Sequence, residues 1–308
     1  MAGPASRYTA DINLRGVNDT HVMAIGRVPS NSRVLDLGAA DGSMAEVLTG
    51  MGCRVWGVEW DPVAAEAARR FCEEVEVGDL NTLDLAGRFG EQKFDVVLML
   101  DVLEHLSDPA AVLRRVAAVL ADGGWGVISL PNVAHVSLRL ALLQGRFEYR
   151  DAGLLDRTHL RFFDRPGVDD LLASAGWSMF DLSRVTRRFG TTEIQLEGTD
   201  PQMVRDLEAD SEGITYQFVI CAAPDGSPVL GRPPVLPAVA AQERVMELEG
   251  NLADRQRDIE WLLERTVTDL PEQLASIRQA SIDRRRQLAD LLVALQEDSE
   301  RLRRSLHG

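Results

Sequence analysis

The sequence predicts an α/β fold in which a doubly wound, mostly parallel sheet is followed by a helical coiled-coil tail. Short apolar runs that are typical of buried strands alternate with segments of helical periodicity, and the first run leads into a glycine-containing turn. Beyond residue 239, apolar residues recur at heptad positions. We therefore divide the chain into an N-terminal helical cap (1–30), an α/β domain (31–225), a Pro-rich linker (226–238) and coiled-coil helices (239–308).

The elements of the predicted domain follow one another in a regular order. A helix is expected around 18–27, and a helix that begins at Asp108 and Pro109 is expected to end at Asp122–Gly124. A loop-rich insertion covers 144–165, and the linker is expected to be extended. Strands are expected over 34–37, 55–59, 75–79, 94–101, 125–130, 177–189 and 214–222, with further helices over 167–175 and 201–209.

The turn after the first strand is the most informative feature of the chain. Gly38 and Gly42 can adopt positive φ, which lets the backbone approach a ligand closely. Glu59 ends the next strand, where a carboxylate is placed to accept both hydroxyls of a ribose. These residues predict a nucleoside-binding site.

The details of the turn decide between two kinds of nucleoside ligand. Its spacing, Asp36-x-Gly38-x-Ala40-x-Gly42, differs from the G-x-G-x-x-G that binds a pyrophosphate. Asp36 and Asp41 bring negative charge to the turn, which would repel phosphates. A cationic ligand fits better, and S-adenosylmethionine carries both an ammonium group and a sulfonium.

From its first to its fifth strand the chain resembles the class I S-adenosylmethionine-dependent methyltransferases. The stretches 130–135, 143–149 and 153–163 resemble a bacterial type-11 or type-23-like branch that is often linked to glycan and cell-envelope biosynthesis. The resemblance covers about 20–225 and implies a Rossmann-like sheet of seven strands closed by an antiparallel pair, with S-adenosylmethionine as cofactor. Ala40 stands where many relatives have glycine, and we expect its φ to be negative.

The resemblance assigns cofactor-binding roles to residues that follow the first four strands. Glu59 is expected at the ribose, and Asp79 with Leu80 beside the adenine. The expected cofactor-binding residues are Asp36, Gly38, Ala40, Gly42, Glu59, Trp60, Asp79, Leu80, Leu100, Asp101 and His105.

Methyl transfer to a hydroxyl needs alignment of the reacting atoms and a base that removes the proton. His135 and His159 follow the fifth strand, where open α/β sheets place their ligands, and are the candidate bases. Asp156 is the candidate orienting carboxylate. Structural roles remain open for both histidines, since His135 can cap a helix and His159 can be a buried hydrogen-bonded residue. No His or Cys spacing indicates a metal, and we expect none.

Three functions remain open after these assignments. The first is O-methylation of a sugar or glycan-related acceptor, because the Asn-Pro-Pro-Tyr motif of amino-group methylases is absent at 100–102. The second is methylation of a quinone, lipid or other small metabolite. The third is a non-catalytic S-adenosylmethionine-binding assembly protein that acts through its coiled coil.

The composition of the chain indicates which classes of substrate and which cell compartment to expect. The formal net charge of −15 argues against nucleic acid as the main substrate, and no apolar run reaches the length of a transmembrane helix. We expect a cytoplasmic protein whose three cysteines are reduced. The tail predicts a homo-oligomer or an assembly partner. Its heptad positions hold Val245, Leu248, Leu252, Ile259 and Leu262, then Leu274, Ile277, Leu288, Leu291, Leu295 and Leu302.

Overall fold

The computed structural model describes residues 18–231 and four residues of the tail, Gln279, Asp283, Arg284 and Gln287. The chain divides into two compact units, Met1–Leu236 and Pro237–Gly308. The four described tail residues are helical and exposed. The predicted heptad positions and most of the predicted linker lie outside the described residues.

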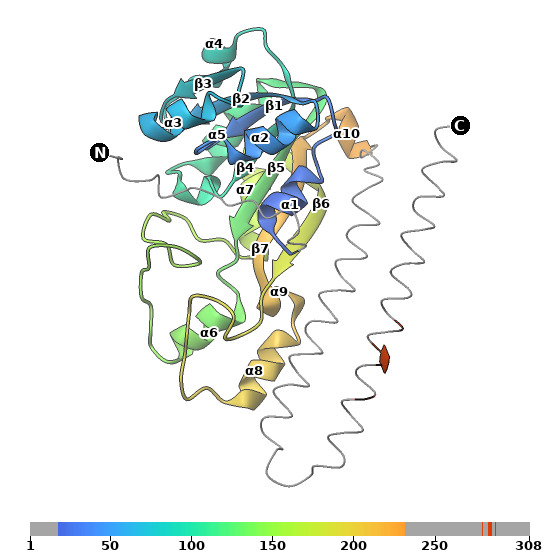
Figure 1. The fold of residues 1–308 in the computed structure, drawn as a ribbon. Coiled ribbons are helices and arrows are strands. Elements are labelled where there is room, and N and C mark those ends of the chain that lie inside the picture. The colour runs from blue at the N-terminus through green and yellow to red at the C-terminus, as the bar shows by residue number, and fades with distance from the viewer. Residues whose placement is uncertain (1–17, 232–278, 280–282, 285–286, 288–308) are drawn as a thin grey trace. The chain divides into compact units, whose positions relative to one another are not determined.

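The first unit is built on one mixed sheet of seven strands in the order β3-β2-β1-β4-β5-β7-β6 (Figure 1). Only β7 runs antiparallel to its neighbours, pairing with β5 on one side and β6 on the other. The strands are β1 (Arg33–Leu37), β2 (Arg54–Glu59), β3 (Glu74–Val77), β4 (Phe94–Leu100), β5 (Leu120–Pro131), β6 (Trp177–Thr186) and β7 (Thr215–Pro224). The expected seven-stranded, mostly parallel sheet is confirmed.

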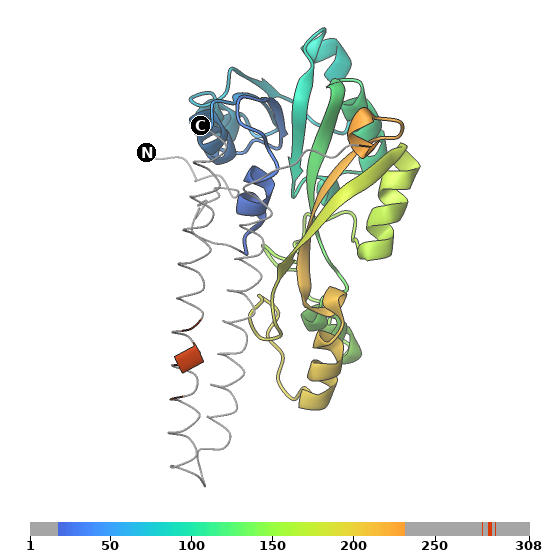
Figure 2. The same cartoon turned by 90° about the vertical axis from the view of Figure 1, so that its right-hand side faces the viewer.

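Helices cover both faces of this sheet, as a doubly wound fold requires (Figure 2). Apolar side chains of α4, α5 and α7 pack on one face, and those of α1, α2 and α10 on the other. α6, α8 and α9 lie beyond one end of the sheet, near the ends of β5 and β7. The helices are α1 (Thr20–Ile25), α2 (Ser43–Gly50), α3 (Pro62–Ala68), α4 (Leu85–Phe89), η1 (Leu103–His105), α5 (Pro109–Ala117), α6 (Val136–Leu143), α7 (Arg165–Ala175), α8 (Pro201–Glu208), α9 (Ser211–Ile214) and α10 (Pro228–Gly231).

Aspartates begin many of these helices. In each case the carboxylate accepts a hydrogen bond from a backbone N–H of the first turn, which has no partner within the helix. A negative charge at this end also interacts favourably with the helix dipole. The capping residues are Asp19, Asp61, Asp84, Asp108, Asp164, Asp200 and Asp210. Part of the strongly acidic composition is therefore used for helix capping.

Two expected elements differ from the structure. The segment Asp122–Gly124 does not end a helix, because α5 stops at Ala117 and the segment belongs to an irregular start of β5. The register with β4 shifts there, from the pair Phe94–Leu120 to the pair Val96–Trp125. The linker is not extended at its start, since Pro228–Gly231 forms the short helix α10.

Arg27 fixes α1 against the last strands of the sheet. Its side chain is 1% exposed and donates to Asp181 on β6 at 2.8 Å and to the Met23 carbonyl at 2.7 Å. It also donates to the hydroxyl of Ser183. A guanidinium buried to this degree depends on these partners, because its desolvation is costly.

We expect Arg27→Ala to lower the free energy of unfolding by about 3 kcal/mol, because it removes packing and leaves Asp181 without its cation. Thermal and urea unfolding of the full chain would measure this change. Arg69→Ala is the matched control, since Arg69 forms an exposed pair with Glu66 on the surface, and such pairs contribute about 1 kcal/mol or less. Equal losses in the two variants would contradict the assignment.

Candidate functional site

A cavity of about 640 Å³ lies where β1, β2, β3 and β4 end. The carboxyl ends of these parallel strands meet at one edge of the sheet, which is where open α/β folds bind ligands. The lining residues are His21, Asp36, Gly38, Ala39, Ala40, Asp41, Ser43, Met44, Val58, Glu59, Trp60, Gly78, Asp79, Leu80, Asn81, Leu100, Asp101, Val102, His105, Leu106 and Thr158. Of the expected cofactor-binding residues, all except Gly42 line the cavity.

The glycine turn follows β1 and forms one wall of the cavity. Gly38 and Gly42 have φ of 85° and 87°, the left-handed region expected for them. A Cβ at Gly38 would lie 2.7 Å from Cγ2 of Val102, and one at Gly42 would lie 2.7 Å from the Cα of Ala68. Gly38 therefore allows the turn to approach β4, and Gly42 allows α2 to begin close to α3.

Ala40 corrects the expectation of a negative φ. Its φ is 45°, which is uncommon for a residue with a Cβ. In this conformation its N–H donates to Oε2 of Glu59 at 2.9 Å. The hydrogen bond to a buried carboxylate helps to stabilise a backbone geometry that alanine alone would disfavour.

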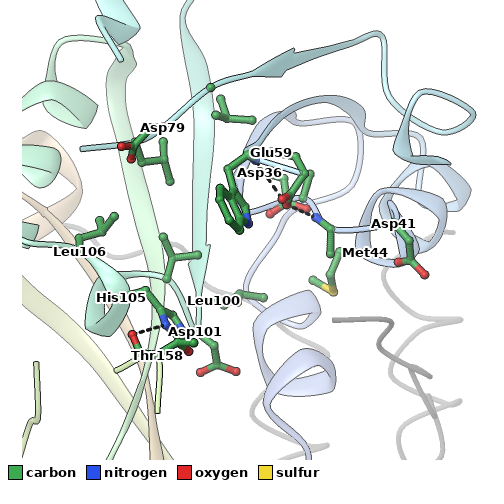
Figure 3. A pocket seen from close by; sticks show the side chains of 18 of the residues that line it. Asp36, Asp41, Met44, Glu59, Asp79, Leu100, Asp101, His105, Leu106 and Thr158 are labelled. Atoms are coloured by element: carbon green, nitrogen blue, oxygen red, sulfur yellow. Dashed lines mark hydrogen bonds between the residues drawn. The ribbon is translucent and has the colours of Figure 1, made fainter. Parts of the chain in front are cut away.

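Glu59 is held at the end of β2 by three backbone amides (Figure 3). Oε2 accepts from Ala40, and Oε1 accepts from Trp60 and Asp61 at 2.9 Å each. The residue is 7% exposed and lines the cavity. Each carboxylate oxygen has more than one acceptor site, so the group can also accept hydrogen bonds from a ligand in a fixed orientation.

Asp36 is the next-to-last residue of β1, just before the glycine turn, and is 4% exposed. Burial raises the pKa of its carboxyl to about 7, a net value in which His21 opposes the shift and the nearby charge of Glu59 adds to it. An ionised Asp36 is therefore costly without a cation beside it. The cavity wall formed by Asp36 and Glu59 fits a positively charged ligand better than a phosphate.

His21, which was not among the expected cofactor-binding residues, lies in the cavity wall on α1. A hydrogen bond from the imidazole to the Asp19 carboxylate raises the pKa of His21, and Asp101 and Asp36 add to the shift. The sequence carried a weak signal for this position, because the residue follows a capping aspartate in the helix that was expected to cover the site.

The opposite side of the cavity is more open and less charged. Asp79 is exposed, and its Oδ1 accepts from the backbone and the side chain of Asn81. Trp60 is 73% exposed although it lines the cavity, and Leu80 is partly buried. Flat apolar surface beside amide groups suits a heterocyclic base.

Asp101 follows β4 with an unusual φ of 54°. Its backbone N–H donates to Oγ of Ser129 at 2.9 Å, and its Oδ1 accepts from that hydroxyl and from the amide of Gln217. The carboxyl is accessible from the cavity but closely surrounded by protein atoms, and this desolvation raises its pKa. The network holds a backbone conformation that is strained for a non-glycine residue.

The candidate catalytic residues His159 and Asp156 lie near His105, which was expected to bind the cofactor. His105 lines the cavity and contacts the Thr158 carbonyl through Nδ1 at 3.1 Å (Figure 3). His159 does not line it, and its ring lies behind that of His105 with centroids 4.9 Å apart. Burial and the adjacent His105 lower the pKa of His159. Although burial of Asp156 acts in the other direction, hydrogen bonds from Thr158 lower the pKa of its carboxyl.

His135 lies away from the cavity and has a structural role. It is fully buried and caps α6, accepting at Nδ1 from the N–H of Ser137 at 3.2 Å. Its Nε2 contacts the Arg187 carbonyl at 2.7 Å. Because both ring nitrogens are engaged and burial lowers the pKa of the imidazole, the structure provides no route by which His135 would take a proton from a ligand in this cavity.

Sequence reasoning missed Glu104, which lies on η1 between Leu103 and His105. The side chain is fully buried, and neither carboxylate oxygen has a hydrogen-bond partner among the described residues. Burial, followed by the charges of Asp101 and Asp156, raises its pKa well above the usual range. A charged residue inside an apolar run, as in Val102–Leu106, is the signal that could have identified it.

Comparisons with known proteins agree with the geometry of the cavity. A family model described as a methyltransferase domain matches residues 13–182. The ubiquinone biosynthesis O-methyltransferase of Bradyrhizobium sp. (strain ORS 278) is 33% identical over 122 residues, which are 39% of this chain and 48% of that protein. The protein of the same name from Xanthomonas axonopodis pv. citri (strain 306) is 29% identical over 161 residues, covering 50% and 66%. The chain thus spans about half of the first relative and just under two thirds of the second.

The solved structures to which the chain is similar include a SAM-dependent methyltransferase from Archaeoglobus fulgidus, at 18% identity and a TM-score of 0.47 over 67% of this chain and 92% of that one. Another is the magnesium protoporphyrin IX methyltransferase of Synechocystis PCC 6803 with bound SAH, at 16% identity and a TM-score of 0.45 over 71% and 90%. In the described part of the chain, no helix combines the length and apolar character needed to cross a bilayer. The match over more than half of the chain shows that it belongs to the class I S-adenosylmethionine-dependent methyltransferases, with S-adenosylmethionine as its cofactor.

Proposed function

We propose that the cavity binds S-adenosylmethionine and that the protein transfers its methyl group to an oxygen of a small phenolic or quinol-type acceptor. The observation that carries the acceptor class is the name shared by the curated relatives, ubiquinone biosynthesis O-methyltransferase. This supports the quinone alternative over the sugar or glycan acceptor that was expected first from the sequence.

The cofactor would lie along the edge of the sheet with its ribose at Glu59. The three amides that hold Glu59 occupy about three of its four acceptor positions, and the remaining position on Oε2 would accept from the ribose. The adenine would lie against Leu80 and Asp79, and the cationic methionine part would lie toward Asp36. This orientation places the buried carboxyl of Asp36 beside the positive charge of the ligand.

An aromatic row connects the surface to the acceptor end of the cavity. Tyr149 and Phe147 are 5.4 Å apart between ring centroids, and Phe147 and Phe162 are 6.2 Å apart. The ring centroids of Phe162 and His159 are 6.2 Å apart, and the ring of His159 lies against that of His105 in the cavity wall. Tyr149, Phe147 and Phe162 are 56%, 46% and 39% exposed, so they offer apolar surface to a hydrophobic acceptor.

Methyl transfer from a sulfonium is an in-line displacement, in which the enzyme mainly aligns the acceptor oxygen with the methyl carbon. His105 and Thr158 form the part of the wall that the acceptor would meet. His159 and Asp156 lie behind them and would act as positioning residues, His159 through its ring contact with His105 and Asp156 through its hydrogen bonds to Thr158.

The test is transfer of radiolabelled methyl from S-adenosylmethionine to a panel of acceptors. The panel contains catechol, a prenylated hydroquinone, and free and nucleotide-linked sugars. We expect label in the two phenolic acceptors, with higher kcat/KM for the prenylated one because it can cover the aromatic row. The matched variant Phe147→Ser should reduce that preference without changing turnover of catechol.

Label in the sugars alone would contradict the proposal and restore the glycan assignment. Cofactor binding with no label in any acceptor of the panel would also contradict it and favour the third function, an assembly protein that binds the cofactor without using it.

A further inference from the structure

We propose that Glu104, His105 and His159 form a binding site for a divalent first-row transition-metal ion in the wall of the cofactor cavity. One carboxylate oxygen and one nitrogen from each ring lie within 4.8 Å of one another. Metal–ligand bonds of about 2.1 Å place ligand atoms roughly 3 to 4 Å apart, so small side-chain movements would close the site around an ion.

Glu104 is the strongest evidence, because its environment is incomplete without a ligand. The side chain is fully buried, and within the part of the chain that the structure describes neither of its oxygens has a hydrogen-bond partner. Its backbone carbonyl accepts from the N–H groups of Leu160 and Arg161, which holds the loop that carries His159 over η1. Buried polar groups almost always have partners, and an unpaired carboxyl is costly.

The two histidine rings are oriented as metal ligands usually are. The contact between Nδ1 of His105 and the Thr158 carbonyl places the proton on Nδ1, so that Nε2 carries the lone pair. The Leu154 carbonyl accepts a hydrogen bond from His159, whose Nδ1 is buried without a partner. Each ring thus has one nitrogen anchored by a backbone carbonyl, the arrangement that sets the tautomer of ligating histidines.

The charges around the site also favour a cation. Asp101 and Asp156 are close enough to influence Glu104 electrostatically, and both act against its ionisation. A dication would turn this repulsion into attraction and would offset the desolvation of Glu104. Without an ion, Glu104 avoids the repulsion from Asp101 and Asp156 by keeping its proton; a bound dication would take the place of that proton.

The ligand set indicates the class of ion. Imidazole nitrogen suits Zn²⁺, Fe²⁺ and Mn²⁺ better than Mg²⁺ or Ca²⁺, which prefer oxygen ligands throughout. Three protein ligands leave open positions for water or substrate. The expectation of no metal came from the search for close His or Cys spacing, whereas this site pairs adjacent residues on η1 with a histidine from a distant loop.

If the proposed methyl transfer is correct, the ion would also act on the acceptor. His105 lines the cavity, so an open coordination position would face the acceptor end. A hydroxyl bound there would have a lower pKa and would lose its proton more readily. This consequence rests on the proposed function, whereas binding of the ion does not.

The experiment measures ion binding by the full chain without cofactor or acceptor. After treatment with a chelator, the protein is titrated with Mn²⁺, followed by electron paramagnetic resonance, and with Zn²⁺ in a calorimeter. We expect a single ion per chain, bound at micromolar concentration or below. Glu104→Gln and His159→Gln should each weaken binding by about 100-fold, the upper part of the range for altering a metal site. Asp151→Asn, which changes an exposed acid of the same loop, should bind as the unmodified protein does.

Circular dichroism checks that each variant is folded before titration. The proposal is overturned if the unmodified protein binds no ion, or if Glu104→Gln binds it with unchanged affinity. In that case infrared spectroscopy should show a protonated Glu104 carboxyl that added Mn²⁺ leaves unchanged. A protein that binds the ion but transfers no methyl to phenols would refute the proposed function alone.

Discussion

Glu59→Gln is expected to weaken binding of S-adenosylmethionine and S-adenosylhomocysteine by about 100-fold each. The amide would direct a donor toward the N–H of Ala40 and would remove a charged acceptor from the ribose, and hydrogen bonds to charged groups contribute about 1.5–3 kcal/mol. Isothermal titration calorimetry with both ligands measures the effect. The two ligands share the ribose, so the loss should be equal for both.

The matched control is Glu66→Gln, which makes the same chemical change on the exposed face of α3. It should leave both affinities unchanged. If Glu59→Gln is folded and binds both ligands as tightly as this control, Glu59 does not hold the ribose.

Asp36→Asn is expected to separate stability from cofactor binding. The variant should bind S-adenosylmethionine at least about 10-fold more weakly at neutral pH, because it removes the buried negative charge nearest to the proposed cationic part. In the unmodified protein, affinity should rise from about pH 6 to about pH 8 as Asp36 ionises, since burial raises its pKa to about 7. This rise should be much reduced in the variant.

The stability of the ligand-free protein should change in the opposite direction. The unfolded carboxyl ionises near its ordinary pKa of 3.8, whereas the folded one stays protonated up to about pH 7. Asp36 therefore reduces the free energy of unfolding as pH rises through this window. We expect Asp36→Asn to be more stable by up to about 4 kcal/mol at pH 8, and the advantage should fall toward pH 4.

Two details keep the test of Asp36 specific. His21, Glu59 and Cys72 interact electrostatically with Asp36, but all three remain in the variant, so the difference between the two proteins reports mainly on Asp36. Methylthioadenosine keeps the ribose and adenine but carries no charge, and it should bind Asp36→Asn as it binds the unmodified protein. Loss of its affinity, or an unchanged pH profile for S-adenosylmethionine, would contradict the role given to Asp36.

The parallel half of the sheet could be predicted from sequence because its strands are short apolar runs with sharp ends. β1, β2 and β4 begin and end within a residue of their expected limits. Glu59 and Asp36 were placed at the cavity for the same reason, since the carboxyl ends of neighbouring parallel strands must meet. In this part of the fold the apolar runs of the sequence are enough to locate the strands, and the parallel pairing of the strands then brings their carboxyl ends together.

Features that depend on tertiary contacts could not be predicted in this way. The positive φ of Ala40 accompanies a hydrogen bond from its N–H to the Glu59 carboxylate across the turn. Asp122–Gly124 belongs to β5, which pairs with β4 on both sides of this segment. The position of His135 in the chain suggested a catalytic base. Only the fold shows that its Nε2 contacts the Arg187 carbonyl. The cluster around Glu104 likewise depends on how the loop that carries His159 folds over η1.

A crystal structure of the full chain with S-adenosylhomocysteine tests the central claim most directly. The account predicts that the ribose hydroxyls lie within hydrogen-bond distance of the Glu59 carboxylate, with the adenine against Leu80 and the amino group toward Asp36. Ligand density elsewhere, or an adenosyl group whose ribose faces away from Glu59, would contradict it.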